Sequence, residues 1–189
     1  LQEKYVPQVT PSFVAIDPVA LADEKINALS FPLFIKPIKA NFSIFAARVT
    51  SSSQLREMVG TYKLPLLFTQ QFDWYMQKLN ITAETADCYI AEQLLEGIQV
   101  TLEGYVYQGE VIIVGIVDSI MYPGTISFER FVYPSSLPLS VQQRMHDAAN
   151  IVMQSVGYNN GFFNIEFMYN PATDAIKIIE INPRMASQF

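Results

Sequence analysis

The C-terminal stretch of the chain constrains the fold most, because it reads as two apolar strands joined by a polar turn. Branched and aromatic residues dominate 162–169 and 175–181, and the segment 170–174 between them contains the Asn, Pro and Asp that are typical of turns. Each strand carries one acid inside its apolar run, Glu166 in the first and Glu180 in the second. The pattern predicts a β-hairpin with one polar face.

Side chains alternate between the two faces of a strand, so the polar residues of this hairpin are expected to gather on one side. Asn164 and Glu166 share a face of the first strand, and Glu180 and Asn182 share a face of the second. With the turn centred near Ala172, the numbers of paired residues should sum to roughly 344. This register predicts that Asn164 faces Glu180, with Glu166 one diagonal step away.

Two readings of the acids follow from the hairpin alone. Two carboxylates buried together repel each other and lose solvation, and a divalent cation removes both costs. Carboxylate and amide oxygens favour Mg²⁺ or Mn²⁺ over zinc. The other reading is that Glu166 and Glu180 point to solvent from a sheet that is covered on one side only.

Length and composition set wider bounds on the protein. The chain has 189 residues, half of them hydrophobic, which is enough for one domain or two closely joined lobes. Its net charge of −6, without a run of like charges, argues against a nucleic-acid-binding surface. A single cysteine, Cys88, excludes an intrachain disulfide and fits a reducing, cytoplasmic setting. No apolar stretch is long enough to predict a membrane span. Because the chain runs from Leu1 to Phe189, we expect a piece of a longer protein.

The order of the expected elements indicates an α+β protein. Hydrophobic periodicity, caps and turn residues predict strands at 11–16, 31–37, 44–49, 88–95, 98–107, 111–120 and 126–133, and helices at 17–29, 51–59, 66–79 and 140–156. The helix at 66–79 is rich in aromatic residues. Such a stripe can be a partner surface, but it is more often part of a core.

Two motifs in the hairpin resemble the metal-binding strands of the ATP-grasp superfamily, the ATP-dependent carboxylate–amine ligases and their relatives. They are Phe-Asn-Ile-Glu-Phe at 163–167 and Glu-Ile-Asn-Pro-Arg at 180–184. The resemblance implies two lobes with mostly antiparallel sheets and a nucleotide cleft between them. The smaller lobe would be residues 1–95, carrying Lys36 and the phosphate loop, and the larger lobe residues 96–189, carrying the hairpin.

The same resemblance implies the ligands of the site. Glu166, Glu180 and Asn182 would bind Mg²⁺ or Mn²⁺ that accompanies ATP. Arg184, two residues after the amide, would neutralise charge on a phosphoryl or carboxylate oxygen.

Lys36 stands in the otherwise apolar strand 32–37, where a buried lysine needs an anion. This strand resembles the ATP-grasp strand whose lysine contacts nucleotide phosphate; an edge-strand lysine that reaches water is the alternative. The family's glycine-rich phosphate loop corresponds to 38–43. Only Ser43 matches it, the glycines are absent, and Lys39 is expected to supply charge in place of the missing backbone amides.

The sequence Glu-Gln-Leu-Leu-Glu-Gly-Ile-Gln at 92–99 resembles the family's hinge between lobes. The resemblance implies that backbone groups bind the adenine edge, from the four residues Glu92, Gln93, Leu94 and Leu95. Gln99 stands where the family has a ribose-binding acid, and Glu96 is an alternative for that role. An ordinary strand–turn–strand explains the same residues in isolation.

The activity that the resemblance implies is an ATP-dependent ligase, with Lys36 and Arg184 as its catalytic residues. ATP would phosphorylate a small-molecule carboxylate, and an amine or similar nucleophile would displace phosphate. No nucleic acid or membrane partner is expected, and a homodimer is left open. The other hypothesis is a non-catalytic module of the same fold that binds nucleotide, or a protein through the aromatic helix.

Overall fold

The computed structural model describes residues 1–18, 26, 29–38, 45–61, 70, 74–78, 88–125 and 127–186. Contacts divide the chain into two units, one formed by residues 12–94 and the other by residues 1–11 together with 95–189. The sequence prediction placed residues 1–11 in the N-terminal lobe. They pack with the C-terminal unit instead, because Val6 and Val9 are buried in its core.

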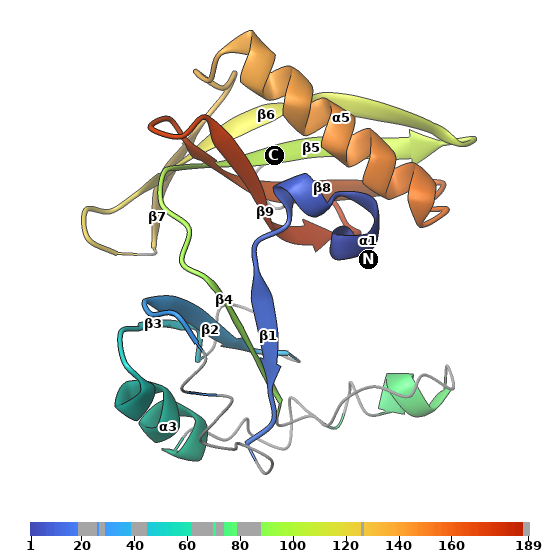
Figure 1. The fold of residues 1–189 in the computed structure, drawn as a ribbon. Helices are drawn as coiled ribbons and strands as arrows, with labels where there is room; N and C mark the ends of the chain where they lie inside the picture. Colours follow the sequence, from blue (N-terminus) through green and yellow to red (C-terminus); the bar gives the residue numbers. More distant parts are fainter. Residues whose placement is uncertain are drawn as a thin grey trace. The chain divides into compact units, whose positions relative to one another are not determined.

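The C-terminal unit is built on a five-stranded antiparallel sheet. Its strand order is β7-β6-β5-β8-β9, and its strands are β5 (Ile98–Tyr107), β6 (Glu110–Met121), β7 (Phe128–Val132), β8 (Gly161–Asn170) and β9 (Ala175–Asn182). One long helix, α5 (Leu139–Ser155), lies across one face of this sheet (Figure 1). The short helices α1 (Gln2–Tyr5) and η1 (Pro7–Val9), which the sequence reading did not predict, complete that side.

Alternation along the strands explains why one face is apolar and the other polar. Alternate residues of β5 and β8 are buried against α5, and they include Val100, Leu102, Val106, Phe163, Ile165 and Phe167. Met145, Ala149 and Val152 of α5 pack into the same cluster. The intervening residues of the two strands must therefore face away from the helix. They are the polar residues that the candidate site uses.

The other unit contains a four-stranded antiparallel sheet and helix α3 (Ser52–Thr61). Its strands are β1 (Phe13–Ile16), β2 (Leu33–Pro37), β3 (Ala47–Val49) and β4 (Tyr89–Gln93), in the order β1-β4-β2-β3. Ile16, Leu33, Ile35, Val49 and Leu55 are among its core residues. Strand β2 is paired with β4 over its whole length and with β3 over Leu33 to Ile35.

The predicted α+β class with two lobes and mostly antiparallel sheets is confirmed. Much of the predicted helices at 17–29 and 66–79 lies outside the described residues. Within the second of these, Trp74 is 54% exposed and Tyr75 57% exposed, so the expectation that this aromatic stripe is core was wrong for both. Among the helices that the structure describes, none has the length and apolar character needed to cross a bilayer.

Candidate functional site

A β-bulge in β9 creates the polar face of the hairpin. Glu166 pairs with Glu180, but the next pair is Phe167 with Ile178, so Ile179 is an extra residue. In a regular strand, residues two apart share a face, so Glu180 would follow Ile178 and point into the core. The bulge turns Glu180 to the face that carries Glu166.

Because of the bulge, the observed register of the hairpin differs from the one predicted from sequence. Asn164 pairs with Asn182 and Glu166 with Glu180, so the numbers sum to 346 here and to 345 beyond the bulge. The predicted sum of 344 was wrong because the turn spans four residues and the bulge adds one more step. The two acids therefore face each other directly, which is a closer juxtaposition of like charge than the predicted diagonal.

Amide groups extend the acid pair toward the end of the sheet. Asn182 Nδ2 donates a hydrogen bond to Asn164 Oδ1 at 3.1 Å, and Asn164 Nδ2 donates to the backbone carbonyl of Arg184 at 3.2 Å. With its Nδ2 used in this way, the Asn182 amide presents Oδ1 as its remaining oxygen donor. Two facing carboxylates and one amide oxygen are a donor set that fits a hard divalent cation.

Strand β5 places further polar side chains on this face. Thr101 pairs with Glu166 and Glu103 with Asn164, and both β5 residues are almost completely buried. Gln99 Nε2 donates to Glu166 Oε2 at 3.0 Å. Gln99, which is expected to bind ribose, is thus hydrogen-bonded to Glu166, an expected metal ligand. The Gln99 Oε1 atom can still accept a hydrogen bond from a hydroxyl.

Glu103 is the most perturbed acid among the described residues of this face. Burial raises its pKa to about 7, against the lowering effects of a backbone hydrogen bond from Ala186 and the positive charge of Arg184; the charge of Glu166 raises it further. Its Oε1 has no hydrogen-bond partner within the part of the chain that the structure describes. The sequence reading missed Glu103, although its spacing of two from Thr101 in an apolar strand was the available signal.

In the four-stranded sheet, Lys36 forms a salt bridge with Glu92. Lys36 Nζ lies 2.9 Å from Glu92 Oε2, and the side chains are 26% and 17% exposed. The two residues lie on neighbouring strands, since Phe34 pairs with Glu92 and Lys36 with Ile90. Strand β2 lies between β4 and β3, but its pairing with β3 covers Leu33 to Ile35 and does not include Lys36. The anion that a lysine in an apolar strand requires is a glutamate of the hinge segment.

The hinge segment leaves the strand pairing where the adenine contacts are expected. The β2–β4 ladder ends at Gln93 and the β5–β8 ladder begins at Ile98, so Leu94 and Leu95 lie in neither. The backbone N–H of Gln93 is already used within the protein, because it donates a hydrogen bond to Ser12 O at 2.9 Å. Lys39 and Ser43 of the expected phosphate loop lie outside the described residues.

Gly97 is required where the chain enters β5. Its φ is +142°, and a Cβ there would lie 2.1 Å from the backbone oxygen of Tyr169. No other residue can make this approach without moving the backbone of β8. The glycine of the expected hinge is therefore explained by contact with a neighbouring strand.

Comparison with known proteins decides the family. Residues 29–189 match the ATP-grasp domain family, which is most of the chain. The chain belongs to the ATP-grasp family. Within carbamoyl phosphate synthase large chains, it is 43% identical over 44 residues to that of Acidobacterium capsulatum and 41% identical over 56 residues to that of Thermotoga neapolitana. These matches cover 23% and 29% of this chain but only 4% and 5% of the relatives.

Solved structures agree on the ATP-grasp fold. L-amino acid ligase from Bacillus licheniformis superimposes with a TM-score of 0.67 at 18% identity, over 95% of this chain and 37% of that one. Biotin carboxylase from Campylobacter jejuni, in a β-γ-ATP complex, gives 0.69 at 17% identity, over 95% and 38%. The chain thus spans well under half the length of these two proteins.

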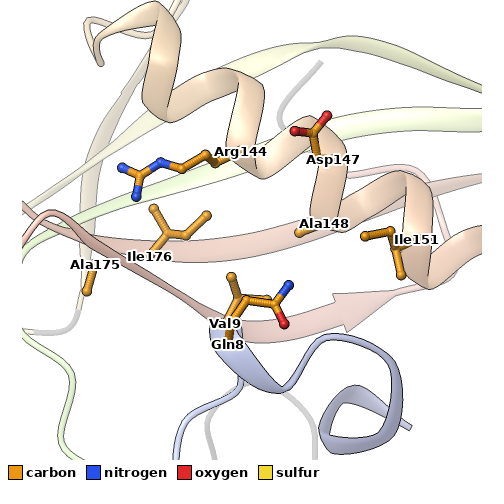
Figure 2. A pocket seen from close by; sticks show the side chains of 8 residues that line it. All are labelled: Gln8, Val9, Arg144, Asp147, Ala148, Ile151, Ala175 and Ile176. Atoms are coloured by element: carbon orange, nitrogen blue, oxygen red, sulfur yellow. The ribbon is translucent and has the colours of Figure 1, made fainter.

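The ATP-grasp chain also has a pocket on the opposite, helix-covered side of the sheet. It has a volume of about 330 Å³ and lies between α5, η1 and the start of β9 (Figure 2). Arg144 at its rim is already paired with Asp174, through Nη2–Oδ1 at 2.7 Å and Nη1–O at 2.8 Å. None of the sequence-predicted site residues lines this pocket, so it is separate from the polar face.

Proposed function

We propose that this chain is the nucleotide-binding core of an ATP-dependent ligase that activates a carboxylate for attack by an amine or similar nucleophile. The observation that carries the proposal is the facing pair Glu166–Glu180, turned out of the core by a bulge and flanked by Asn182. Membership of the ATP-grasp family supports it, as do neighbours of the same fold named as ligases. Another neighbour of the same fold, an N5-carboxyaminoimidazole ribonucleotide synthetase, was solved as an ADP complex.

Glu166, Glu180 and Asn182 would hold Mg²⁺ or Mn²⁺. When bound, the ion would offset negative charge on the ATP phosphates. The bound ion would also relieve the repulsion between the two carboxylates, and it would attract the nucleotide's phosphates to the same face. Metal and nucleotide are therefore expected to bind with mutual reinforcement.

Lys36 and Arg184 would act on the transferred group as fixed positive charges. A carboxylate oxygen of the substrate bonds to the γ-phosphorus, the bond to the β-phosphate oxygen breaks, and ADP leaves. The amine nitrogen then attacks the acyl carbon, phosphate leaves with the bonding electrons, and the amine loses a proton. The side chains contribute positioning and electrostatic stabilisation and form no covalent bond.

The hinge contacts belong to the same proposal. Backbone groups at 92–95 would bind the adenine edge, and Gln99 would bind ribose through its amide oxygen. Lys39 and Ser43 are proposed to contact phosphate from the loop. Small-molecule carboxylate and amine substrates, a cytoplasmic setting and, as an open option, a homodimer complete the proposed description.

Trapping the activated carboxylate tests the chemistry. The full-length protein is incubated with ATP, Mg²⁺, hydroxylamine and a panel of small carboxylates, and hydroxamate and ADP are measured. We expect hydroxamate and ADP to form in equal amounts with at least one carboxylate, and only when Mg²⁺ is present. Tight MgATP binding with no ADP formed under any condition would support the non-catalytic module instead, for which the absent loop glycines are the motivating feature.

A further inference from the structure

The chain after β9 is held against the polar face by side chains from two other strands. Asn164 of β8 donates a hydrogen bond to the carbonyl oxygen of Arg184 at 3.2 Å, and it accepts one from Asn182 at 3.1 Å. Both contacts are made by one amide that is only 2% exposed. Because its nitrogen and its oxygen are each used, Asn164 is committed to the protein and not to a metal.

Glu103 continues this arrangement on the next strand. It is the direct cross-strand partner of Asn164 and is 3% exposed. The backbone N–H of Ala186 hydrogen-bonds to its carboxyl group, and the charge of Arg184 acts on it. Two neighbouring side chains, one a donor and the other an acceptor, therefore bind the backbone on either side of Met185.

We propose that Glu103 and Asn164 are positioning residues that clamp the backbone of residues 184–186 and so fix where Arg184 projects from the polar face. The inference deepens the proposed function, because it assigns what orients the arginine expected to meet the transferred phosphoryl group. Glu103 offers this segment a hydrogen-bond acceptor, whereas Asn164 offers it a donor. Neither residue needs to touch the nucleotide.

The first test reads the clamp directly and needs no nucleotide. Amide hydrogen exchange at Ala186 is measured by NMR in the full-length protein and in Glu103→Met, which has similar volume but no acceptor. We expect exchange at Ala186 to speed up about tenfold, the effect of losing one hydrogen bond, while the amides of Ile165 and Phe167 stay protected. Unchanged exchange at Ala186 would overturn the proposal.

Three further variants separate the clamp from a general loss of packing. Glu103→Gln keeps an acceptor, so protection at Ala186 should be retained. Asn164→Asp removes the donor to Arg184 and should loosen the segment even if Glu103→Met fails to fold. Ser119→Ala is the matched control, because Ser119 is 5% exposed and its hydroxyl has no partner among the described residues. Loosening by Ser119→Ala equal to that by Asn164→Asp would contradict the clamp.

The second test asks whether the clamp serves Arg184. Binding of MgADP and of Mg²⁺ with a non-hydrolysable ATP analogue is compared in wild type, Arg184→Ala, Glu103→Met and the double variant. Each single variant should reduce the preference for the ATP analogue by about tenfold and leave MgADP binding unchanged, with no further loss in the double variant. Additive losses would overturn the proposal. If wild type binds neither nucleotide, the proposed function fails, and the exchange result at Ala186 still decides the clamp.

Discussion

Charged side chains are arranged in opposite ways in the two sheets. In the five-stranded sheet, Glu166 faces Glu180 across a strand pair, so like charges oppose each other. In the four-stranded sheet, Lys36 Nζ lies 2.9 Å from Glu92 Oε2, so opposite charges are already paired. The difference teaches where a cation could act: the hairpin brings two like charges to one face, whereas Lys36 already has Glu92 as a counterion.

The largest effect should come from the acid most deeply placed in the five-stranded sheet. The pKa of Glu103 is raised from 4.5 to about 7 by burial. Between these pH values the Glu103 carboxyl is ionised in the unfolded chain but protonated in the folded chain. The free energy of unfolding therefore falls as pH rises, by up to about 3 kcal/mol by pH 8. Glu103→Gln should flatten this dependence.

Urea unfolding at pH 5 and pH 8, in EDTA, checks this prediction. The matched control is Glu110→Gln, since Glu110 is exposed at the start of β6 and its replacement should leave the dependence as in wild type. Equal slopes for Glu103→Gln and wild type would show that the carboxyl ionises freely in the folded state.

Lys36→Ala should give the next largest effect, on nucleotide affinity. A charge-assisted contact to phosphate contributes roughly 1.5–3 kcal/mol, so ATP affinity should fall about 10- to 150-fold. Isothermal titration with MgATP measures the loss. Lys177→Ala is the control, because Lys177 in β9 is tied to the carbonyl oxygens of Gln8 and Thr10 at 3.1 and 2.9 Å. A loss as large in the control would contradict a specific role for Lys36.

Glu92→Gln tests the ion pair between Lys36 and Glu92 in the four-stranded sheet. It leaves Lys36, only 26% exposed, without its counterion, so the free energy of unfolding should drop by about 1 kcal/mol. Chemical denaturation measures the drop, and the double variant Lys36→Met/Glu92→Gln should recover part of it. A double variant less stable than the single one would mean that the pair stabilises the unit through contacts other than its charge.

Sequence reasoning predicted the elements well because their patterns are local. The hairpin, the two long strands of β5 and β6 and the helix α5 each follow from periodicity and turn residues. The resemblance to ATP-grasp enzymes came from short motifs at 163–167 and 180–184, and the family match confirms it. Both predictions depend on residues close together in the chain.

What the sequence did not predict depends on non-local geometry. The bulge at Ile179 shifts the pairing by one residue, and its only local sign is two successive isoleucines before Glu180. Glu103 enters the site because β5 pairs with β8, a contact more than fifty residues apart in sequence. The packing of residues 1–11 against the C-terminal unit is similarly a tertiary contact, since Val6 and Val9 carry no local signal for their partners.

The smallest effect on stability should come from the acid pair itself. Glu180→Gln removes one of two facing like charges, so the free energy of unfolding without metal should stay the same or rise by up to about 1 kcal/mol. Thermal unfolding in EDTA measures the change. A loss of several kcal/mol would instead make Glu180 part of a structural ion pair.

The central claim is that the facing acids Glu166 and Glu180 form a cation site that serves the nucleotide. Metal-dependent ATP binding is its most direct test. Isothermal titration of the full-length protein with ATP is carried out with Mg²⁺ and with EDTA, in wild type, Glu180→Gln and Glu166→Gln. We predict that Mg²⁺ strengthens binding by wild type at least about tenfold, and that each substitution removes most of this gain while leaving binding in EDTA unchanged. Equal dependence on Mg²⁺ in wild type and both variants would contradict the account.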